Sequence, residues 1–504
     1  MLPSPVSVMN QMLRAISTFT LLGFLASQPA ARAEDPAYWS WAPTPPMGWN
    51  SWDAFGSSVK EDQVLANAEY VDEHLKAHGW NLVTVDIQWY EPTAQKDQYR
   101  RGALLAMDEY GRLLPAPNRF PMTAETHSFK PMGDYLHAKG LKFGLHLMRG
   151  IPRQAVNNPK GTPILGTSFQ AADIADKAHS CFWNTDMYGV DMTKPGAQEY
   201  YDSVFALMAS WGLDFVKVDD LAGHRAEIEA IRRAIDKCGR PIVLSISMGS
   251  PASEGAHLET NANQWRVSFD FWDNWRALYN QFANLNAHQP YQGPGHWPDA
   301  DMLPFGNLKT WEPSTYTKFT HNEQYTVMTL WSIARSPLIL GANLPKNDDF
   351  TLSLLTNDEV LAVNQASLDN HQVYNRSNHI AWVASVPGSI DKYVALFNVS
   401  PPPPPDTRRR RGGLGSFGGP PGSNAPVNVT AAAPATAATN APTVIDPAAK
   451  LPATVTLSLA DIGITGSATV RDLWAQKDLG TVTGTVSVTV NSHGAALLRI
   501  HTEN

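Results

Sequence analysis

The chain has few of the features that mark disulfide-rich, nucleic-acid-binding or membrane proteins. It contains only 2 Cys among 504 residues. Its formal net charge is -8, which argues against nucleic acid or an anionic membrane surface as the main partner. Beyond the N-terminal segment, no stretch is long and apolar enough for a transmembrane helix. We therefore expect no nucleic-acid partner and no stable membrane insertion, and the oligomeric state stays unknown at this point.

The N-terminus has the pattern of an export signal. Arg14 is a short basic flank, residues 15–26 form an apolar run, and residues 31–33 form a small-x-small cleavage site. The run is too short to span a bilayer. These features predict a signal peptide at residues 1–33, cut before Glu34, and a mature protein that is periplasmic or secreted.

Between residues 46 and 343, strand patterns alternate with amphipathic helix patterns. The predicted strands are 47–52, 82–89, 142–148, 214–219, 242–247, 266–270, 297–303 and 337–341. The clearest predicted helices are 60–78, 196–210, 225–237 and 322–334. Eight strands alternating with helices over about 250 residues or more are typical of a TIM barrel. We therefore predict an α/β fold, a (β/α)8 barrel over residues 34–364.

Polar residues recur where the predicted strands end. Those at or just after a carboxyl end are Asp53, Asp86, His146, Arg149, Asp219, Asp270 and Asp299. The active sites of barrel enzymes are built at this face, from the loops that follow the strands. Because so many polar residues take corresponding positions, we predict a functional site at this mouth of the barrel.

The stretch WGLDFVKVDDL at residues 211–221 places a lysine and an aspartate on one predicted strand. Side chains alternate along a strand, so Lys217 and Asp219 share a face. Burying two charges at the end of an apolar strand is costly unless they are paired or serve a site. Taken alone, this pattern fits both a functional pair and a structural ion pair.

The two cysteines fall at opposite faces of the predicted barrel. Cys181 lies in the long loop after the third strand, and Cys238 ends the helix after the fourth. A helix of about 15 residues spans roughly 22 Å, whereas a disulfide needs its Cα atoms within about 7 Å. We therefore predict two free thiols.

The sequence pattern changes after Asp358. Short alternating segments separated by turns occupy residues 379–386, 392–398, 454–459, 469–474, 484–490 and 494–500. They predict an antiparallel β-sandwich over residues 365–504. Residues 401–450 are rich in Pro, Gly, Ala and Thr, a composition that buries too little apolar surface to fold, so we predict a disordered insertion. The arginines at 408–411 fit a binding patch, a protease site or a solvated loop.

Several motifs carry a resemblance to a known family. They are PPMGWNSWDAFG at 45–56, VDIQW at 85–89, FVKVDD at 215–220, WRVSFD at 265–270 and GPGHWPDADML at 293–303. Together they resemble glycoside hydrolase family 27, the α-galactosidase or melibiase family. The motifs come in the family's order and cover nearly the whole predicted barrel, and a C-terminal sandwich is similar to the family's as well.

The resemblance implies a role for each matching residue. Asp219 matches the nucleophile, and Asp270 matches the general acid/base. Trp52 matches the aromatic floor of the sugar pocket, and Asp86 matches the first of two adjacent sugar-binding aspartates. The residues expected to bind or support the substrate are Trp52, Asp53, Asp86, Ile87, His146, Arg149, Lys217, Ser247, Arg266, Asp299 and Asp301.

Two aspartates suffice for the chemistry that the resemblance implies. A retaining glycosidase needs two carboxyl groups about 5–5.5 Å apart, one to attack the anomeric carbon and one to protonate the leaving oxygen. Lys217 favours the ionised form of Asp219, as a nucleophile requires. Asp270 is expected on the same strand and face as Arg266, in a partly dry pocket that favours a protonated acid.

Three positions depart from the family pattern. Ile87 replaces the second of the two adjacent aspartates, which in the family bind hydroxyls at the C4 and C6 end of galactose. His146 replaces the usual aromatic after the third strand and is followed by the unusual MRGIPR at 148–153. Ser247 stands where galactosidases commonly carry a glutamate, and it is similar to the N-acetylgalactosaminidase branch. All three bear on the choice of sugar and leave both matching aspartates in place.

The resemblance favours a retaining α-galactosidase that acts on a carbohydrate substrate. Within the family the alternatives are β-L-arabinopyranosidase and α-N-acetylgalactosaminidase. A non-catalytic sugar-binding protein is disfavoured because both Asp219 and Asp270 are present. No set of His, Cys, Asp and Glu has metal-ligand spacing, so no metal and no other cofactor is expected, and a metal-dependent hydrolase is disfavoured.

Overall fold

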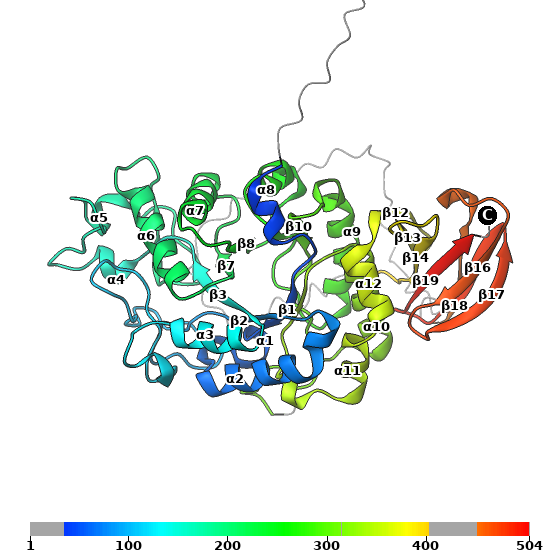
Figure 1. The fold of residues 1–504 in the computed structure, drawn as a ribbon, viewed down its shortest axis with the longest axis horizontal. Coiled ribbons are helices and arrows are strands. Elements are labelled where there is room, and N and C mark those ends of the chain that lie inside the picture. Colours follow the sequence, from blue (N-terminus) through cyan, green and yellow to red (C-terminus); the bar gives the residue numbers. More distant parts are fainter. Residues whose placement is uncertain (1–34, 314, 403–450, 503–504) are drawn as a thin grey trace, which may run out of the picture. The chain divides into compact units, whose positions relative to one another are not determined.

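The computed structural model describes residues 35–313, 315–402 and 451–502, drawn in colour in Figure 1. The predicted signal peptide at 1–33 lies outside these residues. So does the predicted insertion at 401–450, apart from Pro401 and Pro402. From Ala37 onward, the barrel and the C-terminal sandwich form one unit.

Eight parallel strands form the predicted (β/α)8 barrel. They are β1 (Met47–Asn50), β2 (Leu82–Val85), β3 (Lys142–Met148), β7 (Phe215–Asp219), β8 (Val243–Ile246), β9 (Gln264–Arg266), β10 (Trp297–Asp299) and β11 (Leu338–Leu340). They neighbour one another in sequence order, and β1 also pairs with β11. A parallel bridge between Leu303 and Leu340 joins the segment after β10 to β11. This bridge closes the ring.

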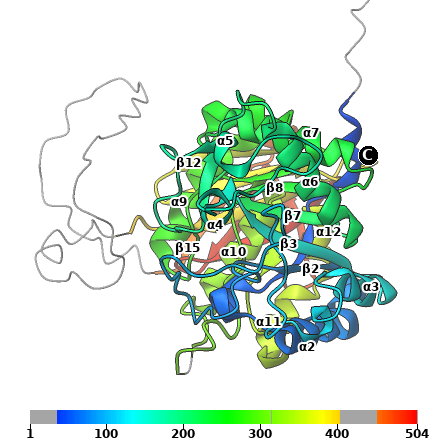
Figure 2. The same ribbon diagram turned by 90° about the vertical axis from the view of Figure 1, so that its left-hand side faces the viewer.

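Helices alternate with the strands and pack against their outer face. Those on the barrel are α2 (Glu61–Tyr70), α3 (Lys130–Ala138), α6 (Ala197–Ser210), α7 (Arg225–Lys237), α8 (Gly255–Glu259), α9 (Trp275–His288), α10 (His321–Ile333), α11 (Asp349–Leu355) and α12 (Asp358–Ala366). Figure 2 shows α3, α6 and α7 outside β2, β3, β7 and β8. In α7 the buried Ile228, Ile231 and Ile235 recur every three or four residues, which places one apolar face on the sheet.

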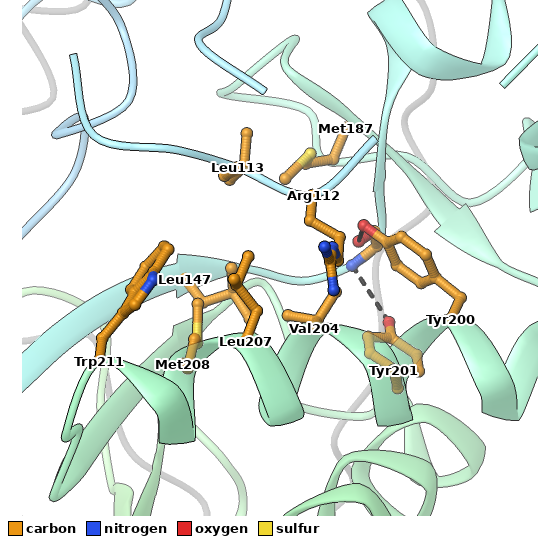
Figure 3. Close-up of a pocket in the computed structure, with 11 residues that line it drawn as sticks. Arg112, Leu113, Leu147, Met187, Tyr200, Tyr201, Val204, Leu207, Met208 and Trp211 are labelled. Atoms are coloured by element: carbon orange, nitrogen blue, oxygen red, sulfur yellow. Dashed lines mark hydrogen bonds between the residues drawn. The ribbon is translucent and has the colours of Figure 1, made fainter. Parts of the chain in front are cut away.

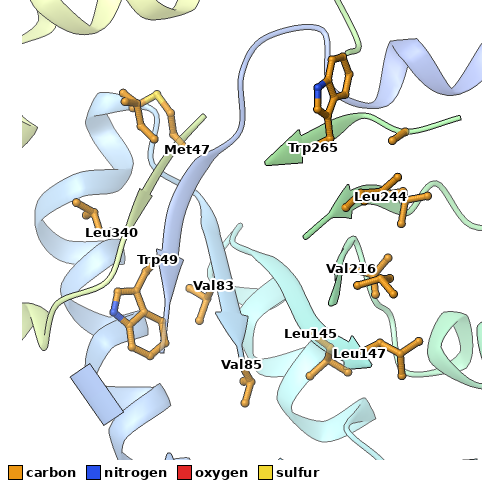
Figure 4. Close-up of a cluster of buried hydrophobic side chains, with 14 of the residues drawn as sticks. Met47, Trp49, Val83, Val85, Leu145, Leu147, Val216, Leu244, Trp265 and Leu340 are labelled. Atoms are coloured by element: carbon orange, nitrogen blue, oxygen red, sulfur yellow. The ribbon is translucent and has the colours of Figure 1, made fainter. Parts of the chain in front are cut away.

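The alternation along β7 sorts its side chains between two environments. Val216 and Val218 are fully buried in the large cluster between strands and helices, where Figure 4 also shows Leu244 and Trp265. Phe215 belongs to a separate, smaller cluster with side chains of other barrel strands. Lys217 and Asp219 share the face of Phe215, as period-two alternation requires. The strand thus carries both charges toward the inside of the barrel, near its carboxyl end.

Several strands end earlier than predicted. Strand β1 stops at Asn50 and short helix α1 (Trp52–Phe55) follows; β2 stops at Val85. The sixth strand was predicted at 266–270, which is wrong because β9 is Gln264–Arg266 and Asp270 lies in the loop beyond it. Ile87, past the end of β2, is buried outside a strand, whereas Val85 is buried within one. Local patterns do not distinguish these two kinds of burial.

The C-terminal strands form antiparallel sheets, as predicted. The sheet in the order β12-β13-β14-β19-β16-β17 consists of β12 (Leu368–Arg376), β13 (His379–Ser385), β14 (Lys392–Asn398), β19 (Ala495–Thr502), β16 (Ser467–Asp472) and β17 (Lys477–Thr483). A second sheet pairs β15 (Ala453–Ser458) with β18 (Thr485–Val490). Apolar side chains from both sheets form one buried cluster. The sandwich contacts the barrel where His493 stacks on Trp275, with ring centroids 3.6 Å apart.

Both cysteines are free thiols, as predicted. Cys181 is buried, and burial raises the pKa of its thiol to about 12. Cys238 follows the last residue of α7. Among the helices of the described ranges, none is both long and apolar enough to cross a membrane.

Candidate active site

A cavity of about 560 Å³ opens at the predicted mouth of the barrel. Its lining includes residues that follow β1, β2, β9 and β10 and residues of β7 itself. The predicted site residues that line it are Trp52, Asp53, Asp86, Ile87, Lys217, Asp219, Arg266, Asp270 and Asp301. The structure therefore brings most of the predicted site residues together in one cavity of the size that binds small ligands.

Asp219 lies between two basic side chains at the end of β7. Its Oδ2 is 2.9 Å from His146 Nε2 and 3.9 Å from Lys217 Nζ. Burial alone would raise the pKa of Asp219, but the charge of Lys217 and the hydrogen bond with His146 hold it below its usual value. Asp219 therefore stays ionised at neutral pH, as expected for a nucleophile.

Asp86 and Lys217 form a second buried pair on the cavity floor. Asp86 Oδ2 accepts hydrogen bonds from Asn50 Nδ2 at 2.6 Å and from Lys217 Nζ at 3.0 Å. Despite its burial, the pKa of Asp86 is lowered, chiefly by the charge of Lys217. The Lys217 ammonium therefore connects Asp86 to Asp219, and it fixes the positions of two carboxylates that face the cavity.

Arg266, the last residue of β9, also connects two carboxyl groups, those of Asp270 and Asp301. Its Nη1 donates to Asp270 Oδ1 at 3.0 Å, and its Nη2 lies 3.0 Å from Asp301 Oδ2. The guanidinium is buried, but the Asp270 side chain is 71% exposed. Our expectation of a partly dry environment for Asp270 is therefore wrong, because the loop after β9 places this carboxyl group at the open mouth. The guanidinium holds Asp270 in place there.

Asp86 and Ile87 both line the cavity, although they are adjacent in sequence. Strict strand alternation would turn Ile87 away from Asp86. Strand β2 has already ended at Val85, so alternation does not apply at these positions. The Ile87 side chain is only 1% exposed and presents no hydrogen-bonding atom to the cavity.

Trp52 and Asp53 complete the floor. The Trp52 ring stacks on Tyr99, with centroids 5.8 Å apart and an interplanar angle of 6°. Asp53 is buried, and its Oδ2 has no hydrogen-bond partner within the part of the chain that the structure describes. Burial and the neighbouring Asp301 raise the pKa of Asp53 well above its ordinary value. Asp53 thus lines the cavity as a buried carboxyl group whose Oδ2 faces Gly341.

Four predicted substrate-binding residues do not line the cavity: His146, Arg149, Ser247 and Asp299. His146 lies behind Asp219 and contacts it directly. Ser247 and Asp299 line a small buried space beneath the cavity. Asp299 accepts hydrogen bonds from Gln264 and Asp301, and burial raises its pKa to about 7.

Arg149 belongs to a buried ion network, and its predicted place in the substrate pocket is not supported. Its Nη1 lies 2.6 Å from Glu227 Oε1, and its Nη2 lies 2.8 Å from Asp220 Oδ2. The Tyr201 hydroxyl donates to Glu227 and accepts from Gly150 N–H at 3.2 Å, the dashed line in Figure 3. The guanidinium is thus engaged by the carboxylates of Glu227 on α7 and of Asp220 after β7, and it also donates to the backbone carbonyl groups of Asp220 and His179. Its role is to hold the segment after Asp219.

Aromatic side chains that we did not predict surround the outer cavity. They are Tyr99, Phe182, Trp183, Phe269, Trp272 and Trp311. Most lie in loops whose course depends on tertiary contacts, so the sequence holds no local signal for their convergence. Within the described ranges, no group of three or more His, Cys, Asp or Glu is arranged to hold a metal ion.

The comparisons with known proteins agree with this site. A family model described as alpha galactosidase A matches residues 185–366, and one described as alpha galactosidase C-terminal beta sandwich domain matches residues 377–500. These matches and the relatives described below show that the chain is a glycoside hydrolase. The chain belongs to glycoside hydrolase family 27.

Individual relatives differ in the sugar that their names give. The structure of a β-L-arabinopyranosidase of this family from Geobacillus stearothermophilus, in complex with arabinose, is 44% identical; it covers 93% of this chain and 99% of its own, with a TM-score of 0.81. A structure from Bacillus halodurans, described provisionally as an α-N-acetylgalactosaminidase, is 40% identical. The match covers 91% of this chain and 97% of that structure, with a TM-score of 0.74. Alpha-galactosidase A of Cellvibrio japonicus is 29% identical over 65% of this chain and 69% of its own.

Proposed function

We propose that this enzyme is a retaining β-L-arabinopyranosidase. The observation that carries the proposal is Ile87, which lines the cavity beside Asp86. The family resemblance assigns this position to an aspartate that binds the C4 and C6 end of galactose. L-Arabinopyranose has the ring of galactose without the C6 arm, and its β-L linkage corresponds to the α-D linkage of galactose.

An apolar side chain here disfavours a substrate with a hydroxymethyl arm. A hydroxyl group that is buried without a partner costs about 1–3 kcal/mol. His146 and Arg149 do not supply a replacement donor, because neither lines the cavity and both are engaged by carboxylates. A pentopyranose avoids the cost because it places only a ring methylene against Ile87. The 44% identity with the Geobacillus β-L-arabinopyranosidase supports the same choice.

The proposed mechanism is a double displacement. Asp219, ionised beside Lys217, attacks the anomeric carbon, and the bond to the leaving oxygen breaks as Asp270 donates its proton to that oxygen. Asp270 then removes a proton from water, and the water oxygen displaces Asp219 from the anomeric carbon. Each displacement inverts the centre, so the released sugar keeps the anomeric configuration of the substrate. Asp86, Asp53 and Trp52 hold the sugar ring on the floor.

A second candidate is α-galactosidase, as a weaker activity of the same site. The charged floor suits both a β-L-arabinopyranosidase and an α-galactosidase, because arabinopyranose and galactose share the configuration of their ring hydroxyls. Matching curated relatives are named α-galactosidase at 25–29% identity, a more distant likeness. α-N-Acetylgalactosaminidase activity has less support, since Ser247 lines the small buried space instead of the cavity.

A panel of nitrophenyl glycosides tests the proposal. The panel holds β-L-arabinopyranoside, α-D-galactopyranoside, α-D-fucopyranoside and α-N-acetyl-D-galactosaminide. We expect the highest kcat/KM for the arabinopyranoside, with the galactoside lower by about tenfold, the effect of about 1.4 kcal/mol. The fucoside, whose C6 is a methyl group, should exceed the galactoside. A galactoside or acetamido sugar as the best substrate would overturn the proposal.

A further inference from the structure

Two exposed phenylalanines stand at the outer part of the active-site cavity. Phe182 is 81% exposed and Phe269 is 68% exposed, and both line this cavity. No other phenylalanine of the described ranges is exposed. We propose that these two rings form a binding site for a planar aromatic aglycone, so that the natural substrates are aryl glycosides. The inference rests on the proposed retaining reaction but not on the choice of sugar.

The position of Phe269 ties this surface to the leaving group. Phe269 immediately precedes Asp270, the proposed acid. To protonate the glycosidic oxygen, the Asp270 carboxyl group must lie within hydrogen-bond distance of it. The group attached to that oxygen then extends past Asp270, toward the open mouth, where Phe269 is the neighbouring side chain. An aglycone therefore meets an apolar ring first.

Phe182 is held in its exposed position by both sequence neighbours. Cys181 is buried at 5% exposure. Trp183 Nε1 donates to Met248 Sδ at 3.3 Å, and the Trp183 ring lies 5.1 Å from Tyr99, centroid to centroid. Because Tyr99 stacks on Trp52, a chain of aromatic rings leads from the sugar floor to Trp183, the residue after Phe182. The backbone of Phe182 is therefore anchored on both sides, and the anchoring aromatic rings continue into the sugar site.

The chemistry of this outer surface suits a flat apolar group better than a second sugar. A sugar can stack one face of its ring on an aromatic side chain, as proposed for Trp52, but its hydroxyl groups also need polar partners, and phenylalanine has no atom that can bond them. Exposed apolar surface beside a pocket marks a place where a ligand covers it, and aromatic pairs gain energy from stacked or edge contacts. On the same rim, Lys309 Nζ lies 4.5 Å from the centroid of the Trp272 ring. This cation–π contact leaves the ammonium group less available to the hydroxyl groups of a second sugar. Both phenylalanines line the same cavity, so an aryl aglycone in its outer part has an apolar ring to pack against on either side.

The test compares variants on two substrates that share one sugar. The substrates are the fastest 4-nitrophenyl glycoside of the panel and a disaccharide in which the same sugar is linked to glucose. The variants are Phe182→Ala, Phe269→Ala and, as a matched control, Leu104→Ala; Leu104 is 76% exposed and does not line the cavity. Comparing each variant with the parent on the same substrate cancels the intrinsic difference between the leaving groups.

We expect each phenylalanine variant to lower kcat/KM on the aryl glycoside by about fivefold or more, while the disaccharide changes by less than about twofold. Inhibition by the free sugar should not change, since the sugar floor is untouched. The control should be unchanged on both substrates. In transfer reactions, the variants should also lose preference for benzyl alcohol over water as the acceptor.

Two results would overturn the inference. Equal losses on both substrates would show that the rings serve folding or general leaving-group placement. A larger loss on the disaccharide for Phe269→Ala would show that the ring positions Asp270, because poorer leaving groups depend more on acid catalysis. Failure of the arabinopyranoside in the panel would overturn only the proposed sugar, since the aglycone test uses whichever glycoside is fastest.

Discussion

His146 Nε2 lies 2.9 Å from Asp219 Oδ2, and both side chains are buried. A carboxylate can only accept a hydrogen bond, so Nε2 carries the proton. His146 Nδ1 has no partner within the described ranges. The His146 ring therefore donates its hydrogen bond to Asp219. Together with the charge of Lys217, this hydrogen bond keeps the pKa of the Asp219 carboxyl group low. This position differs from the aromatic that the family resemblance leads one to expect.

The first prediction concerns this hydrogen bond. His146→Phe should raise the pKa of Asp219 by removing a donor, so the acid limb of the kcat/KM profile should move to higher pH. His146→Gln is the matched control, since its amide can still donate, and it should keep the limb nearer to that of the parent. Kinetics on a nitrophenyl glycoside from acid to neutral pH provide the measurement. An unmoved limb in the Phe variant would show that His146 does not influence Asp219.

The second prediction concerns the two proposed catalytic aspartates. Asp219→Ala should abolish turnover, and azide should partly restore it by forming a glycosyl azide of inverted configuration. Asp270→Ala should retain more activity on nitrophenyl glycosides than on disaccharides, because good leaving groups need less protonation. Nuclear magnetic resonance of the first product of the parent enzyme should show a retained anomer. An inverted first product would contradict the assignment of Asp219.

The barrel could be predicted because its strands and helices carry their own periodic patterns. Strand β3 and helix α7 occur at the predicted bounds, and Lys217 shares a face with Asp219 as alternation requires. The edge strands β12 and β17 escaped prediction because their residues are mostly exposed and lack a clear apolar face. Periodicity reports burial, and it fails where burial is weak.

The sequence predicted those residues of the site that lie in recognisable motifs, but not the residues that reach it from elsewhere in the chain. Placement at strand ends brought Asp86, Asp219 and Asp299 to the correct face of the barrel. The same reasoning misplaced Arg149, because the carboxylates that engage it come from α7 and from the residue after β7. It also missed Phe182, which lies in a loop far from any motif. Such pairings depend on the tertiary course of the chain, which local patterns do not encode.

The third prediction concerns the buried network of Arg149. Arg149→Leu should lower the free energy of unfolding by about 3–5 kcal/mol, since Glu227 and Asp220 would keep buried charges without their partner. The control, Arg101→Leu, removes an exposed arginine and should stay within about 0.5 kcal/mol. Urea unfolding followed by tryptophan fluorescence measures both. Unchanged stability with a raised KM would instead return Arg149 to the substrate pocket.

The fourth prediction concerns the pH dependence of stability. The pKa of Asp299 is about 7 in the folded protein and has an ordinary value of 3.8. Between these values the folded state binds more protons than the unfolded state, so the free energy of unfolding contributed by Asp299 falls as the pH rises from about 4 to about 7. Asp299→Asn should remove this fall, with an effect on the order of a few kcal/mol.

The Asn side chain can be accommodated at this position. Asp299 accepts from Asp301 N–H and from Gln264 Nε2, whereas Gln264 Oε1 has no partner within the described ranges. A flip of the Gln264 amide would let Oε1 accept from the new Asn. Thermal melts across this pH range, with the exposed Asp134→Asn as control, provide the measurement. A parallel pH dependence in parent and Asp299→Asn would show that Asp299 has no raised pKa.

The last prediction concerns the proposed sugar. Ile87→Asp should shift the ratio of kcat/KM for the α-D-galactoside over the β-L-arabinopyranoside toward galactose by roughly tenfold or more, the effect of about 1.4 kcal/mol. The physical reason is that a hydroxymethyl group would gain a hydrogen-bond partner beside Asp86. Ile87→Asn should shift the ratio in the same direction without adding a charge next to Asp86. Ile87→Val, which only shortens the apolar side chain, should leave the ratio within about twofold. The α-D-fucoside, which lacks the hydroxyl, should gain nothing from the Asp variant. An unchanged ratio in both polar variants would mean that Ile87 does not contact the C6 arm, and the sugar would then have to be decided by another part of the cavity.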